Sequence, residues 1–193
     1  MTALEPIKQP RRVPVIPNAV LAMIIFVVAE VMFFAGVLSA FTIVKAGTLP
    51  GMWPPPNQPR LPAGETAFNT AALLLSGVVL YLAHRKWRAG LAGAKTFIAA
   101  AWALGAFFIV LQGREWVMLL GQGLTMTSSP QGSFFYLIVG THALHGIVAL
   151  VALGMAALRM RAGTLQSGFF FGTQIFWYFV VGLWPIIYAR VYF

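Results

Sequence analysis

Long apolar runs alternate with short polar segments along the whole chain. Five of these runs are long enough to cross a bilayer, which takes about 20 helical residues. They span residues 18–44, 66–88, 95–120, 133–158 and 168–193. Because backbone groups in lipid must be hydrogen-bonded within the protein, runs of this length favour helices. The pattern predicts an all-α fold, an integral membrane bundle of five transmembrane helices that forms a single domain over residues 18–193.

The polar segments predict how this bundle is oriented. Residues 1–17 are polar and proline-rich, which predicts an extended tail. One side of the bundle holds the loops after the first and third runs and the C-terminus, and it carries Lys45, Arg60 and Arg190. Nine basic residues lie on the other side, in the tail and in the second and fourth loops: Lys8, Arg11, Arg12, Arg85, Lys86, Arg88, Lys95, Arg159 and Arg161. Since positive residues stay in the cytoplasm, we expect a cytoplasmic N-terminus and an external C-terminus.

The composition agrees with lipid as the solvent. The chain of 193 residues is 60% hydrophobic and 9% charged, whereas soluble domains carry about 25% charged residues. It contains no cysteine, which excludes disulfides, iron–sulfur clusters and cysteine-ligated zinc. The net charge of +9 comes mainly from the loops, so it indicates membrane topology and not nucleic-acid binding. The sequence contains no nucleophile–base arrangement and no phosphate-binding glycine loop, and we predict no catalytic residue in this chain alone.

Glu30 lies deep inside the first apolar run. It stands thirteen residues past Pro17, which is about 20 Å along a helix and close to the middle of a bilayer. A carboxyl group at that depth takes up a proton or finds a partner. Two roles stay open: an acid that exchanges protons or contacts lipid headgroups, and a protonated carboxyl that is hydrogen-bonded to a neighbouring helix.

His142 and His145 stand three residues apart in GTHALHGIVAL, near the same depth and on one face of a helix. Zinc takes three or four protein ligands, and the only other histidine, His84, lies near the cytoplasmic end of its helix. One helix face cannot supply both axial ligands of a haem, although one histidine could pair with another chain. The residues therefore favour hydrogen bonding between helices over a metal or cofactor site, with Glu30 as the expected partner and His142 as the contact to test.

Further polar residues lie nearer the ends of the runs. In LQGREW, Arg114 and Glu115 are adjacent, so they do not face each other on a helix and each needs another partner. Interface water, a lipid headgroup or a different subunit could supply it, and the pattern favours an interfacial anchor with Trp116. Asn69 opens a stretch of small and hydroxyl residues in the second run, which suits tight helix packing.

Five segments occur in a distinctive order. LAMIIFVVAEVMFFAG carries Glu30 before an aromatic pair, FNTAALLLSGVVLYLAHR carries Asn69 and His84, and LQGREW carries Glu115. SFFYLIVGTHALHGIVAL carries both remaining histidines, and FWYFVVGLWPIIY carries Trp177 and Trp184. From about residue 18 to the chain end, these segments and the MWPP loop resemble subunit III of haem–copper oxidases, the cytochrome c oxidase subunit 3 family. The chain looks like the five-helix bacterial form of that family.

The resemblance implies a function. Members of this family carry no haem or copper, and they pack against the catalytic subunit I of a terminal oxidase that also contains subunit II. They hold ordered phospholipids and help to keep proton uptake and turnover stable during aerobic respiration. The resemblance thus implies a multi-pass protein of the bacterial cytoplasmic (inner) membrane, with haem and copper in the partner. Glu30 matches the family's carbodiimide-reactive glutamate, and we expect phospholipid near Glu30, His84 and Arg85.

The closing segment departs from the family pattern. Tyr178 stands where histidine is usual, and Val181 stands where aspartate is usual.

Three other functions stay open: a subunit-III-like accessory of a nitric oxide reductase or quinol oxidase, a membrane cytochrome that binds haem through His142 or His145, and an independent proton channel through Glu30.

Overall fold

The computed structural model describes residues 17–49, 51–56 and 58–193, so the predicted tail lies outside the described residues except for Pro17. The described residues form five α-helices and no β-strand. They are α1 (Asn18–Ala46), α2 (Ala63–Arg88), α3 (Ala94–Gly121), α4 (Pro130–Arg161) and α5 (Ser167–Val191). All five are long and apolar enough to cross a membrane. The predicted all-α, five-helix fold class is confirmed, with each boundary within three residues of the predicted one.

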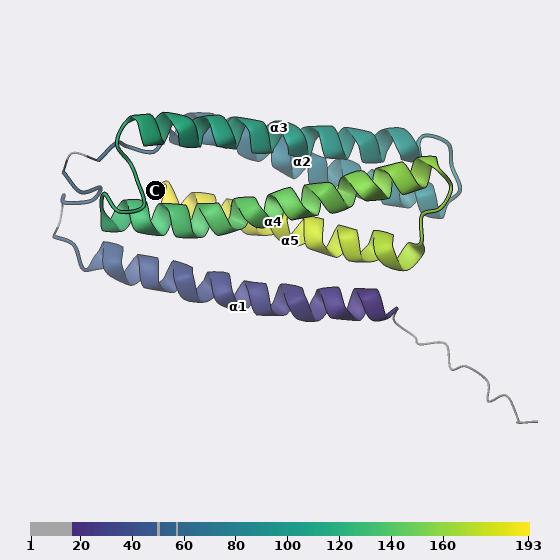
Figure 1. Cartoon of the computed structure of the whole chain (residues 1–193), viewed down its shortest axis with the longest axis horizontal. Coiled ribbons are helices and arrows are strands. Elements are labelled where there is room, and N and C mark those ends of the chain that lie inside the picture. Colours follow the sequence, from purple (N-terminus) through teal and green to yellow (C-terminus); the bar gives the residue numbers. More distant parts are fainter. Residues whose placement is uncertain (1–16, 50, 57) are drawn as a thin grey trace, which may run out of the picture.

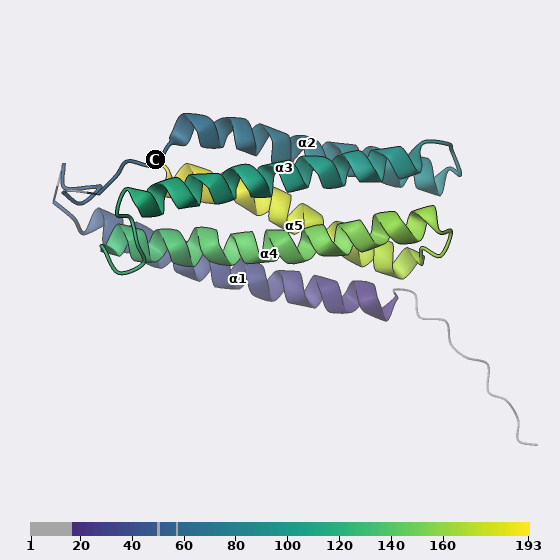
Figure 2. The same ribbon diagram turned by 45° about the horizontal axis from the view of Figure 1, so that its top comes forward.

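The helices lie lengthwise beside one another in an elongated bundle (Figures 1 and 2). The last helix, α5, is central, because it packs against α1, α2 and α4. The hairpin of α2 and α3 lies on one side of α5, and α3 also contacts α4. Within the described residues, α1 packs on α4 and α5 and makes no contact with α2 or α3. The first and second helices therefore flank the last helix without touching each other.

The two ends of the bundle differ in charge. The start of α1 lies at the same end as the α2–α3 and α4–α5 connections (Figure 1). That end carries Arg85, Lys86, Arg88, Lys95, Arg159 and Arg161. The C-terminus lies at the opposite end, beside the α1–α2 and α3–α4 connections. The fold thus collects the basic loops at one end, and their cytoplasmic location stays a prediction from the positive-inside rule.

Large aromatic side chains fill the centre of the bundle. Phe34 of α1, Phe135 of α4, and Trp177 and Trp184 of α5 are fully buried. Their outer neighbours are exposed isoleucine, leucine, valine and phenylalanine side chains, which suit a lipid-facing surface. The helices α1, α4 and α5 thus place large apolar side chains toward the core, while apolar side chains also cover the outside of the bundle.

The start of α4 illustrates how local residues fix a boundary. The helix begins at Pro130, three residues earlier than the apolar run predicts. Ser129 caps it, because the Ser129 Oγ accepts a hydrogen bond from the Gly132 N–H at 3.1 Å. Proline suits the first helical position, where no N–H is required. The polar cap extends the helix beyond the run that a hydropathy pattern can detect.

Candidate functional site

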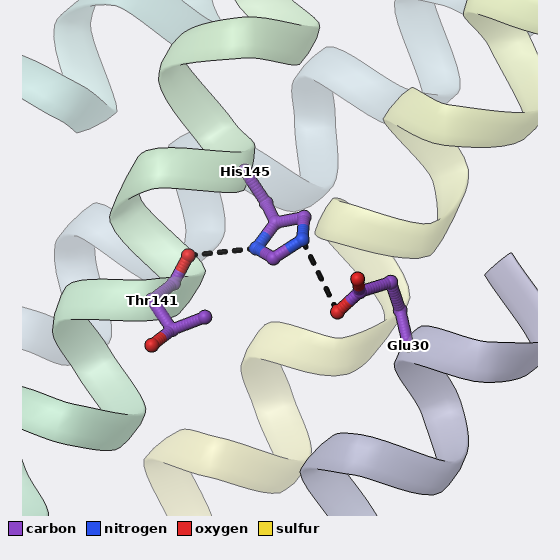
Figure 3. A network of polar contacts seen from close by, with 3 residues as sticks. All are labelled: Glu30, Thr141 and His145. Atoms are coloured by element: carbon purple, nitrogen blue, oxygen red, sulfur yellow. Dashed lines mark hydrogen bonds and ion pairs between the residues drawn. The ribbon is translucent and has the colours of Figure 1, made fainter. Parts of the chain in front are cut away.

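One polar contact joins α1 to α4 in the interior of the bundle. The Nε2 of His145 lies 3.2 Å from Oε2 of Glu30, and its Nδ1 lies 2.7 Å from the carbonyl oxygen of Thr141 (Figure 3). Because a carbonyl only accepts, Nδ1 carries a proton and donates it to Thr141. A single further proton is then shared by Nε2 and the carboxyl group. The pair consists either of a glutamic acid and a neutral imidazole or of a carboxylate and an imidazolium.

The rings around this pair are aromatic. Phe34 and Phe26 of α1 and Phe176 and Phe179 of α5 all place ring centroids within 6.1 Å of the His145 ring. The side chains of His145 and Glu30 are 12% and 20% exposed. An apolar shell of this kind strengthens the interaction between the two groups by excluding water.

His142 occupies a different environment from His145. The expected contact between Glu30 and the histidine pair is present, but His145 makes it, and His142, which the proposed test would have changed, does not. The His142 ring stacks on Trp184, with centroids 5.1 Å apart and planes inclined by 27°. It is 1% exposed, and neither ring nitrogen has a hydrogen-bond partner within the part of the chain that the structure describes. The two histidines, though three residues apart, serve different contacts.

The geometry of both histidines is a poor fit to haem. Both nitrogens of His145 are engaged, one by Thr141 and one by Glu30. His142 faces a pocket of about 120 Å³, whereas sites for small molecules typically measure about 300–1,000 Å³. Among the described residues, no three histidine or acidic side chains converge in a group that could hold a metal ion. The haem-binding alternative therefore has no support from the arrangement of these side chains.

A second polar cluster surrounds Glu115 of α3. Its Oε2 accepts a hydrogen bond from Thr66 Oγ1 of α2 at 2.8 Å, and its Oε1 accepts one from the Tyr192 hydroxyl at 2.6 Å. The Tyr192 hydroxyl also accepts from Gln112 Nε2 at 3.1 Å. Glu115 is 4% exposed. The expected partners of Glu115 were water, a headgroup or another subunit, and this was wrong, because its partners are residues of its own chain.

Arg114 is exposed, unlike the buried Glu115 that follows it, although both line a groove of about 410 Å³ with Glu65 and Asn69. Asn69 is 4% exposed at the wall of this groove. Trp116 packs on Phe135 and Tyr136 of α4, with ring centroids 6.4 and 5.6 Å apart. The three consecutive residues therefore differ in their contacts: Arg114 is exposed, Glu115 is hydrogen-bonded to Thr66 and Tyr192, and Trp116 packs on α4.

The tryptophans of α5 attach it to α2. The indole N–H of Trp177 donates to Ser76 Oγ at 3.2 Å, and that of Trp184 donates to Thr70 Oγ1 at 2.8 Å. All four residues are buried. The face of α2 that carries Thr70 and Ser76 therefore binds the face of α5 that carries Trp177 and Trp184. Tryptophan suits this role because it buries a large apolar area and still requires one hydrogen-bond acceptor.

His84 and Arg85 lie near the basic end of the bundle. His84 lines a groove of about 400 Å³ that also includes Pro17, Tyr81, Gln174 and Tyr178. The groove follows the flank where α1 and α2 do not touch. Arg85, the next residue along α2, is exposed and is not among the residues that line this groove. Glu30 lies elsewhere, beside His145, and does not line this groove.

The two departures from the family pattern have distinct surroundings. Tyr178 is 36% exposed in the groove with His84. Val181 is buried and faces Gly77, where an added Cβ would stand 3.1 Å from the Val181 Cγ1. At this position a close apolar contact between α2 and α5 takes the place of an acidic side chain.

Sequence reasoning did not find Thr66, Gln112 or Tyr192. Thr66 and Gln112 resemble ordinary hydroxyl and amide residues near helix ends, and Tyr192 follows α5 as the second-last residue of the sequence. Thr66 and Tyr192 donate to Glu115 from 49 and 77 positions away, and Gln112 joins the cluster through Tyr192, 80 positions away. No local pattern carries a signal for such a contact.

Comparison with known proteins connects this geometry to a family. Residues 11–193 match the family model described as cytochrome c oxidase subunit III. Cytochrome c oxidase subunit 3 of Oryctolagus cuniculus is 32% identical over 178 residues, which cover 88% of this chain and 67% of the relative. The corresponding proteins of Sus scrofa and Mus musculus are also 32% identical, over 180 and 178 residues, with the same shares covered.

Proposed function

This chain belongs to the cytochrome c oxidase subunit III family, and from that premise we propose that it is a non-catalytic accessory subunit of a respiratory haem–copper terminal oxidase. The observation that carries the proposal is the family match over residues 11–193. The five apolar helices and the family agree on a multi-pass membrane protein. We propose the bacterial cytoplasmic membrane as its location.

In this proposal the chain works through its partners. It packs on subunit I in a complex with subunit II, and the haem and copper that reduce oxygen belong to subunit I. The apolar exposed surfaces of the helices supply a face that can pack against other transmembrane helices. Both nitrogens of His145 already have partners, and the pocket at His142 is small, which supports the proposal that this chain binds no haem of its own.

We further propose that phospholipid binds in the groove beside His84. The groove combines apolar walls from Val20, Phe171 and Ile175 with the polar groups of His84 and Gln174. Arg85 is the next residue along α2 and is exposed. A cation at the basic end of the bundle suits an anionic headgroup. Acyl chains would lie along the flank between α1 and α2. These two helices do not contact each other, and α5 packs against both of them.

The Glu30–His145 pair has a structural role in this proposal. It fixes α1, the helix with the fewest buried residues, to α4. A stable α1 keeps the lipid groove in shape, and the complete subunit in turn sustains proton uptake by the catalytic partner through many turnovers. The expected result of removing the chain is an oxidase with a normal initial rate and a shortened active lifetime.

Purification of the tagged chain in mild detergent tests the partner. We expect a haem–copper subunit I to accompany it, with haem absorption bands that leave when the partner is stripped away. A nitric oxide reductase subunit in its place would overturn the proposed reaction. A stripped chain that keeps a haem band, lost in His142→Ala or His145→Ala, would overturn the accessory role.

Quantitative lipid analysis of the same purified complex tests the groove. The double variant with His84→Ala and Arg85→Ala should lose bound phospholipid, because both polar contacts for the headgroup are removed. Arg190→Ala is the matched control, since it removes an exposed cation from the opposite end of the bundle. Equal lipid content in the double variant and the control would refute a lipid site at this groove.

A further inference from the structure

Three residues with unpartnered polar atoms line one pocket between α3, α4 and α5. The unpartnered atoms are the Oε1 of Gln112, the Nε1 of Trp116, and the Nδ1 and Nε2 of His142. Each is buried, and none has a hydrogen-bond partner among residues 17–49, 51–56 and 58–193. Gln112 and His142 are 4% and 1% exposed. Buried polar atoms in proteins are nearly always paired with protein or with ordered water.

The pocket has the size and the polarity that water requires. Its volume is about 120 Å³, and one water molecule takes up about 30 Å³ of liquid volume. The Trp116 indole donates one hydrogen bond and the Gln112 oxygen accepts, while a neutral imidazole offers one donor and one acceptor. The donors and acceptors of these residues are therefore balanced, as a small group of bound waters requires. The remaining walls include Phe108, Val139 and Trp184.

The polar groups continue from the pocket toward Glu115. Gln112 uses its oxygen at the pocket and its Nε2 to donate to Tyr192, at 3.1 Å. Tyr192 donates to Glu115, which also accepts from Thr66. Toward His145 no hydrogen bond continues from His142 within the described residues, and the Phe34 ring contacts both histidines, with centroids 6.2 Å from His142 and 5.7 Å from His145.

We propose that this pocket binds a cluster of ordered water molecules that connects His142 to Gln112 and, through Tyr192, to Glu115. The bundle then contains two separate polar sites: a hydrated one around His142, Gln112 and Trp116, and a dry pair formed by Glu30 and His145. This proposal rests on the contacts within the chain and is independent of the proposed oxidase function.

The three histidines of the chain provide the test. The full chain, labelled with isotopic nitrogen in histidine only, is reconstituted into phospholipid vesicles for solid-state magnetic resonance. Magnetisation transfer from water protons to each imidazole N–H is then measured. We expect transfer to His142, although its ring is the most buried, and none to His145, whose N–H is bonded to Thr141. His84 in its open groove is the positive control.

A pair of variants locates the water. Gln112→Leu should abolish the transfer to His142, because it removes the pocket amide that bridges to Tyr192. Gln131→Leu is the matched control, since Gln131 is also buried but does not line this pocket, and it should leave the transfer intact. No transfer to His142 in the unaltered chain would overturn the proposal. Transfer that persists in Gln112→Leu would also overturn it, because water would then reach His142 by another route.

Discussion

The contact between Gly105 and Trp177 offers a sharp test of how tightly α3 and α5 pack. A Cβ added at Gly105 would overlap the Cη2 of Trp177 and stand 2.6 Å from its Cζ2 and 3.1 Å from the Leu150 Cδ1. Trp177 is fully buried, and its indole N–H is held by Ser76. The ring cannot retreat from Gly105→Ala without straining its packing and lengthening that hydrogen bond.

The expected cost follows from these two effects. Overpacking of a core by one methyl group costs about 1–3 kcal/mol, and loss of one hydrogen bond costs about 1 kcal/mol. Gly105→Ala should therefore lower the free energy of unfolding by about 2–4 kcal/mol. The control is Gly113→Ala on the same helix, where an added Cβ has no neighbour within 4 Å. It should change stability by less than about 0.5 kcal/mol, because the helix persists in the membrane-bound unfolded state.

Titration of the purified chain with sodium dodecyl sulfate in mixed micelles, followed by circular dichroism, measures both variants. A third variant separates overlap from any other effect. Trp177→Phe removes the overlapping ring atoms, so Gly105→Ala should cost less in that background, with a coupling of about 1–3 kcal/mol. Equal stability of Gly105→Ala and Gly113→Ala, or strict additivity in the double variant, would refute this account of the packing.

Two further perturbations address the polar clusters. Glu30→Gln and His145→Phe should couple in a double-mutant cycle by about 0.5–1.7 kcal/mol, within the range measured for polar contacts in membranes. The effects of Glu30→Gln and His142→Phe on stability should be additive. Coupling of Glu30 to His142 alone would contradict the pairing of Glu30 with His145. Tyr192→Phe should lower the free energy of unfolding by about 1–3 kcal/mol in the same micelle titration, because it leaves a buried oxygen of Glu115 without its donor. The loss should shrink when Glu115 is already Gln, and an undiminished loss would place the role of Tyr192 elsewhere.

The apolar runs predict the helices well because the physical requirement is simple. A span of lipid needs about 20 apolar residues, and no other feature of the sequence competes with that signal. The misplaced ends have local causes. At the start of α4, for example, the cap by Ser129 and the proline at position 130 add polar residues to the helix. Such caps extend a helix into regions where hydropathy no longer marks it.

The pairing of Glu30 could not be predicted from spacing. Residues 142 and 145 advance by about 300° around a helix, so the two side chains diverge by about 60°. Which of them faces α1 depends on the rotation of α4 about its axis. In a soluble helix an amphipathic pattern sets that rotation, but α4 is apolar toward both lipid and core. Close contacts of small residues contribute to fixing it, such as Gly146, whose added Cβ would stand 3.1 Å from the Ile109 Cδ1.

The exposure of α1 has a consequence for how the bundle opens. Only Phe34, Leu38 and Phe41 of its 29 residues are buried, whereas α5 is buried along most of its length and holds α2 and α4. Regions with few buried contacts unfold locally at low free energy, while the rest of a protein stays intact. The first helix can therefore detach as a unit of its own, breaking one polar pair and leaving both tryptophan hydrogen bonds of α5 in place. Hydrogen exchange should resolve two protection levels in this protein, a lower one for α1 that Glu30→Gln reduces further, and a higher one shared by the other four helices.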